Sequence, residues 1–253
     1  MVVLAVAVAV AGCGSAPVAD LPPAARPAAS PPQRERPAGR LIPAAARPEG
    51  LAPARRVTAA VAGRTFVADA RTSTISVREG GRRVAAFRVA GHPAALSPAD
   101  RGRRLAVLSG RERVLELYDP RTLRRVARAT AGVGPTHVVA EADRLYVADT
   151  QGGALLVFRV APELELVRRV HLPGSPYGMA VDPERHRLWI TLTARNALVS
   201  LPANGRPRVI RTLPTVRQPD AVAVDASSGT VRVRSAGVLQ LVGADEAYGE
   251  DER

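Results

Sequence analysis

The chain has 253 residues, of which 46% are apolar but only 3% aromatic, so any core must be built mainly from valine, alanine and leucine. Valine favours strands, because its branched side chain packs well on a pleated surface. All 36 basic residues are arginine, and the formal net charge is +13. These arginines are scattered, with no run of five like charges, which is typical of a solvated surface; we therefore expect no nucleic-acid partner. The single cysteine, Cys13, excludes an intramolecular disulfide.

An apolar run over residues 2–11 opens the chain and is too short to span a bilayer as a helix. It ends in Val10-Ala11-Gly12-Cys13, which resembles the lipobox of bacterial lipoprotein signal peptides. The resemblance implies a signal peptide over residues 1–12, cleavage before Cys13 and a diacylglyceryl group on its sulfur. Two acyl chains anchor a protein stably to a membrane. We therefore expect export and a lipid anchor on the outer face of the cytoplasmic membrane, or on a periplasmic membrane face.

A segment rich in proline, alanine and arginine follows the cysteine, including the run LPPAARPAASPPQRERPAGR over residues 21–40. It contains almost no large apolar side chain whose burial could offset the entropy of ordering. We predict that residues 13–38, which begin with the lipidated cysteine, form a disordered tether, with the folded domain over residues 39–243.

Five prolines then recur at nearly constant spacing, at intervals of 40, 42, 41 and 43 residues, and each precedes a short apolar stretch. They are Pro53, Pro93, Pro135, Pro176 and Pro219. A second apolar run follows each proline, over residues 65–69, 105–110, 145–150, 188–193 and 231–235. A third follows over residues 74–78, 114–118, 155–160, 197–201 and 238–242. A fourth occurs in the first four copies, over residues 84–89, 125–129, 166–172 and 208–213. Four strands every 40 to 43 residues match the spacing of a propeller blade.

The motif Leu145-Tyr146-Val147-Ala148-Asp149, with Gly134-Pro135 before it, resembles the YVTN and NHL-like β-propeller repeats over residues 53–242. The resemblance implies an all-β fold, a five-bladed β-propeller of four-stranded antiparallel blades. A parallel β-helix or a β-sandwich is the alternative, although neither explains so steady a period.

The fifth copy lacks a fourth strand, because residues 244–253 form an acidic C-terminal tail. An unpaired strand edge invites aggregation, so the missing strand has to come from elsewhere. Residues 39–46 lie just upstream of the first repeat, where a fourth strand belongs, and Pro43 is tolerated best at an outer edge. We predict that this N-terminal stretch completes the last blade.

In a propeller, the loops before the first strand of each blade gather with the loops between the second and third strands around one mouth of the channel, and binding residues usually lie there. We predict a ligand-binding rim at this face that consists of Arg55, His92, His137, Tyr177, Asp220, Asp149 and Asn196.

Two arrangements at this rim would give it metal chemistry. Asp69, Asp149, Asn196 and Asp220 offer oxygen ligands suited to a hard divalent cation, although an Asp at the position of Asp149 more often accepts hydrogen bonds from turn amides. His92 and His137 occupy similar places in adjacent blades, where two imidazoles could hold a transition metal. The interpretation as ordinary loop residues is favoured in both cases, so we expect no cofactor and keep a divalent cation as the alternative.

No nucleophile elbow, P-loop, zinc-protease motif or dinucleotide fingerprint occurs, and we predict no catalytic residue. Export, a tether and a repeat scaffold favour a monomeric binding or scaffolding module for a protein, peptide or glycan of the cell envelope. A metal-dependent hydrolase resembling gluconolactonase-type propellers and an accessory protein of a periplasmic redox enzyme are the alternatives.

Overall fold

The computed structural model describes residues 23–43, 57–235 and 237–249 of the chain. These residues form five four-stranded antiparallel sheets, which confirms the predicted blades. Blade 1 comprises β2 (Val57–Val61), β3 (Arg64–Asp69), β4 (Thr74–Glu79) and β5 (Arg82–Arg88). Blade 2 comprises β6 (Pro93–Ala99), β7 (Arg104–Ser109), β8 (Val114–Tyr118) and β9 (Arg125–Thr130). Blade 3 comprises β10 (Pro135–Glu141), β11 (Arg144–Asp149), β12 (Ala154–Arg159) and β13 (Glu165–His171).

Blade 4 comprises β14 (Pro176–Asp182), β15 (Arg187–Leu192), the 3-10 helix η1 (Thr193–Arg195), β16 (Ala197–Pro202) and β17 (Arg211–Pro214). Blade 5 comprises β18 (Ala221–Asp225), β19 (Thr230–Ser235), β20 (Val238–Val242) and β1 (Arg40–Pro43), and the short helix α1 (Ala244–Tyr248) follows it. The recurrent prolines mark the inner strands: Pro93, Pro135 and Pro176 each begin one, and Pro219 lies two residues before β18.

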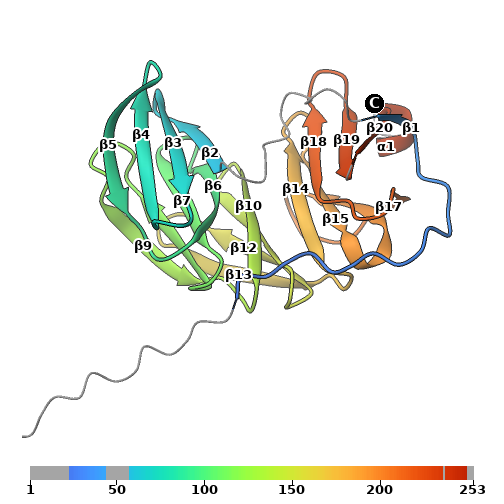
Figure 1. Ribbon diagram of the computed structural model, residues 1–253, viewed down its shortest axis with the longest axis horizontal. Coiled ribbons are helices and arrows are strands. Elements are labelled where there is room, and N and C mark those ends of the chain that lie inside the picture. The colour runs from blue at the N-terminus through green and yellow to red at the C-terminus, as the bar shows by residue number, and fades with distance from the viewer. Residues whose placement is uncertain (1–22, 44–56, 236, 250–253) are drawn as a thin grey trace, which may run out of the picture.

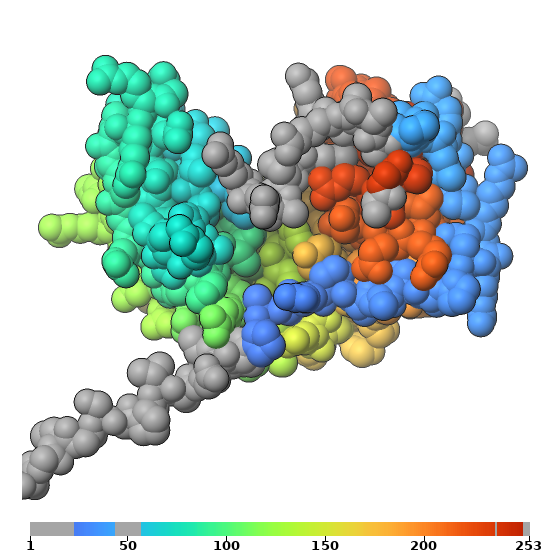
Figure 2. Space-filling view, in the orientation of Figure 1, coloured from blue at the N-terminus to red at the C-terminus, as the bar shows by residue number. Residues whose placement is uncertain are grey.

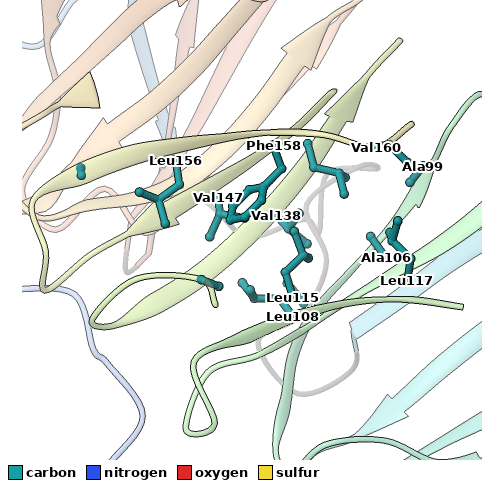
Figure 3. Close-up of a cluster of buried hydrophobic side chains, with 14 residues drawn as sticks. Ala99, Ala106, Leu108, Leu115, Leu117, Val138, Val147, Leu156, Phe158 and Val160 are labelled. Carbon is teal, nitrogen blue, oxygen red and sulfur yellow. The ribbon is translucent and has the colours of Figure 1, made fainter. Parts of the chain in front are cut away.

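The blades pack face to face through apolar clusters, each drawn from two successive blades. Between blades 2 and 3, for example, Ala106, Leu108 and Leu115 face Val147 and Phe158 (Figure 3). Similar clusters join blade 1 to 2, blade 3 to 4 and blade 4 to 5. Because alternate side chains of a strand point to opposite faces, the inner blades are apolar on both sides, and their burial supplies most of the stabilising free energy.

Blade 5 is completed from the other end of the chain, as predicted. Strand β1 pairs antiparallel with β20, with Leu41 opposite Gln240 and Ile42 opposite Leu239. The buried Gln240 side chain donates to the backbone oxygens of Ala38 and Pro214, which ties the approach to β1 to blade 4. Pro43 ends β1 at the outer edge of the sheet, where its missing N–H leaves no ladder bond unmade. Residues 44–46 lie outside the described part of the chain.

The five blades follow one another along an arc. Inner strands β2, β6, β10, β14 and β18 pack side by side in succession, while β2 and β18 stand apart (Figure 1). Among the described residues, no apolar cluster joins blade 5 to blade 1; the free face of blade 5 carries a small cluster of its own around Ala223 and Leu239. The end faces of the arc are also more polar than the inner ones.

The first part of the predicted acidic tail forms a short packed helix. In α1, Ala247 and Tyr248 are buried against blades 4 and 5. The Tyr248 hydroxyl donates to Asp182 at 2.6 Å and accepts from the Trp189 indole at 3.2 Å. Burial, together with the hydrogen bond to Asp182, raises the pKa of Tyr248, so the hydroxyl keeps the proton that it donates. Residues 250–253 lie outside the described part of the chain.

The described part of the predicted tether, residues 23–38, lies against the propeller, which is a correction to the predicted disorder of this segment. We call them the strap; it crosses blade 4 and leads into β1 (Figures 1 and 2). Side chains of blades 4 and 5 and of their preceding loops hydrogen-bond to its backbone, which compensates for its lack of apolar bulk. Cys13 and the predicted signal peptide lie outside the described residues. Within those residues, no helix is long and apolar enough to cross a membrane.

Candidate functional site

A cavity of about 420 Å³ lies on the concave side of the arc, against the inner strands. Its walls are mainly small apolar residues of the five inner strands, β2, β6, β10, β14 and β18, and Ala24, Ala25 and Pro27 of the strap border it. A volume of this size is within the range of small-ligand pockets. Besides the hydroxyls of Thr58 and Thr136, four larger polar side chains line it: His137, Tyr177, Asp220 and Arg234.

His137 and Tyr177 come from neighbouring inner strands, β10 and β14, and their rings meet edge to face with centroids 4.6 Å apart. Burial lowers the pKa of His137 to about 4, and its Nδ1 has no hydrogen-bond partner. Burial also raises the pKa of Tyr177, with a smaller contribution in the same direction from Asp220. At neutral pH both rings are therefore uncharged, and they offer an apolar surface with polar edges.

Asp220 and Arg234 add one charge of each sign to the cavity. The Arg234 Nε donates to an Asp220 carboxylate oxygen at 3.1 Å, and both side chains are partly exposed. Sequence reasoning placed Asp220 at the rim but missed Arg234. The sequence did contain a signal for Arg234, because an arginine occupies a repeat position that is otherwise uncharged. The second strands of the other blades carry Ala68, Leu108, Ala148 and Thr191 there.

Asp149 acts inside blade 3 and not in the cavity. Its side chain is fully buried, and Oδ1 accepts hydrogen bonds from the backbone N–H groups of Val133, Gly134 and Gly152 at 2.8–3.1 Å. The carboxylate therefore holds two loops together, which is the structural role that aspartate fills in turns. Asp69, at the same repeat position in blade 1, accepts the amides of Arg71 and Thr72 at an exposed site.

The remaining predicted residues are dispersed. Asn196 follows η1 in a left-handed conformation, and its Nδ2 donates to the Pro31 oxygen of the strap at 3.0 Å. His92 contacts Arg111 through its Nε2 at 3.2 Å and is absent from the cavity lining, so it does not join His137 there. Arg55 lies outside the described residues. Of the seven predicted rim residues, the structure brings together His137, Tyr177 and Asp220.

The oxygen ligands proposed for a cation are each engaged elsewhere. Asp69 and Asp149 brace their own loops, Asn196 holds the strap, and Asp220 pairs with Arg234. Across the described part of the chain, no three His, Cys, Asp or Glu side chains gather closely enough to hold a metal ion.

The neutral state of His137 has a measurable consequence. An imidazole in an unfolded chain titrates near 6.5, so the depressed folded-state pKa of His137 contributes stability above that pH. This contribution is lost as the pH falls through about 4, because the buried ring must then be protonated. We expect NMR titration of the ring carbons to show a neutral His137 at pH 5.5. A resonance that shifts with a midpoint near 6.5 would contradict the burial of this ring.

Comparisons with known proteins support the propeller fold. A functionally unknown protein from Desulfotomaculum acetoxidans is similar with a TM-score of 0.65 at 12% identity, over 71% of this chain and 62% of that one. Streptogramin B lyase is similar with a TM-score of 0.63 at 9% identity, over 77% and 66%. Virginiamycin B lyase from Staphylococcus aureus is similar with a TM-score of 0.58 at 11% identity, over 71% and 62%.

These identities show a shared fold and nothing finer. The chain spans about two thirds or less of the length of these three propeller proteins. No family model matches the chain, and no curated protein matches it in sequence. The protein is thus a five-bladed β-propeller protein.

Proposed function

We propose that the chain is an exported, lipid-anchored binding module that holds a peptide or glycan of the cell envelope in the cavity lined by the inner strands of the five blades. The observation that carries the proposal is the cavity itself, a concave apolar surface with a ring pair on two neighbouring inner strands and an ion pair at the adjoining blade 5. Apolar walls with a few convergent polar groups characterise small-ligand sites.

The chemistry of the four side chains fits a ligand with both apolar and polar faces. The rings of Tyr177 and His137 can pack on the C–H face of a sugar or on an alanyl side chain. Arg234 can donate to a carboxylate or carbonyl, and Asp220 can accept from a hydroxyl or amide. The similarity to two lyases is one of fold, and we do not extend their activity to this chain.

The test uses disaccharide-peptide fragments of peptidoglycan as the probe and calorimetric titration as the measurement. We expect Arg234→Ala to weaken binding about tenfold, the equivalent of ~1.4 kcal/mol. Arg232→Ala is the matched control, because Arg232 lies on the same face of β19 and pairs with Asp225 at 3.1 Å outside the cavity. Equal losses in both variants, or no binding by the unaltered chain, would count against the cavity as the binding site.

The anchor is tested separately. We expect the chain expressed in a bacterial host to incorporate labelled palmitate and to sediment with membranes, and we expect the Cys13→Ala variant to do neither. Labelling that persists in the variant would remove the proposed anchor.

A further inference from the structure

Side chains of the propeller hold the strap through hydrogen bonds to its backbone N–H and C=O groups. The Gln218 side chain accepts from the Ser30 N–H at 3.1 Å and donates to the Ala28 oxygen at 2.9 Å. The Ser175 hydroxyl accepts from the Ala28 N–H at 3.1 Å. Paired contacts of this kind recognise an extended chain independently of most side chains, as an added strand does.

The same groove has one side-chain pocket. Ser30 is only 8% exposed, and its hydroxyl donates to the Thr193 oxygen at 2.6 Å while accepting from the Gln218 N–H at 2.7 Å. The Arg217 guanidinium and Asn196 then donate to the Pro31 oxygen. A serine followed by proline is therefore bound through its hydroxyl and through the carbonyls on either side of the Ser-Pro bond.

The groove residues also adopt costly backbone conformations. Ser175, Asn196 and Gln218 all have left-handed φ angles, of 60°, 49° and 55°. Residues other than glycine rarely adopt this conformation, and His92, which precedes Pro93 in blade 2, shares it with a φ of 52°. Ser175 and Gln218 occupy the same place in blades 4 and 5, directly before the proline of the inner strand.

We propose that Ser175, Asn196, Arg217 and Gln218 form a recognition site for an extended Ser-Pro peptide of a partner protein, occupied here by the chain's own residues 28–31. The inference rests on the proposed binding function and names its ligand class. Ala24, Ala25 and Pro27 of the strap border the cavity, so a peptide in this register would continue into it. A partner has to displace the strap, whose covalent attachment gives it an effective concentration in the millimolar range.

The experiment adds a synthetic peptide of residues 24–34, AARPAASPPQR, to the full chain and follows amide NMR shifts. We expect no binding to the unaltered chain below about 1 mM, because the strap competes. In Ser30→Glu the buried position receives a charge that expels the strap, and the peptide should then bind saturably. Ala29→Glu is the matched control: Ala29 is the exposed neighbour, so this variant should behave like the unaltered chain. A peptide with alanine at the serine position should bind about tenfold more weakly.

A second measurement covers the case in which Ser30→Glu fails to release the strap. In the unaltered chain, the amides of Ala28 and Ser30 should exchange with solvent slowly, and in Gln218→Ala both should lose that protection. Unprotected amides in the unaltered chain, or a folded Ser30→Glu chain with a released strap that does not bind the peptide, would overturn the proposal. Peptidoglycan binding that still depends on Arg234 would then leave the proposed function standing.

Discussion

Gly39→Ala should unfold blade 5 from its outer edge and lower the free energy of unfolding by about 3 kcal/mol. Gly39 has a φ of +68°, and a Cβ added there would lie 2.0 Å from the Leu241 backbone oxygen. That oxygen belongs to β20, the partner of β1, so neither group can move without breaking the strand pairing. For a domain of this size the loss corresponds to a Tm lower by roughly 6–12 °C.

Gly237→Ala is the matched control for this variant. Gly237 lies in the same blade with a φ of +77°, and an added Cβ there would have no atom within 4 Å. It therefore carries the conformational cost of about 1 kcal/mol without the collision. Thermal unfolding of the two variants separates the two effects. Equal midpoints would show that β1 does not pack on β20 as described.

Asp182→Ala is expected to be the other strongly destabilising change, by about 3–5 kcal/mol. The Asp182 carboxylate is fully buried and accepts from the backbone N–H groups of Glu184 and Arg185, from the Arg185 guanidinium and from the Tyr248 hydroxyl. Its removal leaves the Tyr248 hydroxyl and the amides without their acceptor and loosens α1. Chemical denaturation of the variant measures the loss.

Asp225 provides the comparison within the same chain. It ends the inner strand of blade 5 as Asp182 ends that of blade 4, and it accepts from Ser227, Ser228 and Arg232. Its side chain is 31% exposed, so water can replace the lost partners. We expect Asp225→Ala to cost much less than Asp182→Ala. Similar losses would mean that the repeat position, and not the buried contact with α1, sets the energy.

The blades could be predicted from the sequence because each one repeats the same physical requirements. A proline begins an inner strand, apolar side chains alternate along the next strand, and turn residues separate the strands. The N-terminal origin of β1 followed from the missing fourth strand and from the position of Pro43. Each of these signals is local, or repeats at a fixed interval, so no knowledge of distant contacts was needed.

The sequence also shows that the two end blades differ from the inner ones. In the second strand of a blade, the second and fourth residues face the preceding blade, and the third and fifth face the following one. The backward positions are Leu145 and Val147 in blade 3 but Thr65 and Val67 in blade 1. The forward positions carry apolar or small side chains in blades 1 to 4 but arginine in blade 5, at 232 and 234. The two faces that lack a partner blade therefore carry more polar side chains than the faces packed between blades.

The strap and α1 could not be predicted in the same way. Composition indicates whether a segment can bury its own apolar surface, and residues 23–38 cannot. Their order comes from groups more than 140 residues away, such as Ser175 and Gln218. Likewise, the acidic composition of the tail gave no indication that Tyr248 is buried, because its partners Trp189 and Asp182 lie in blade 4. The sequence predicted part of the cavity, because three of its polar residues lie in or next to the inner strands, where binding residues were expected. Arg234 was not predicted, because it lies on the second strand of its blade.

The proposed binding site requires that one blade is assembled from both ends of the chain, because that blade supplies Asp220 and Arg234 to the cavity. Cross-strand NOEs between β1 and β20 test this directly. The structure predicts contacts between Arg40 and Leu241 and between Ile42 and Leu239. Contacts shifted by one residue, or a β20 that shows no partner on its outer side, would contradict the assembly of this blade.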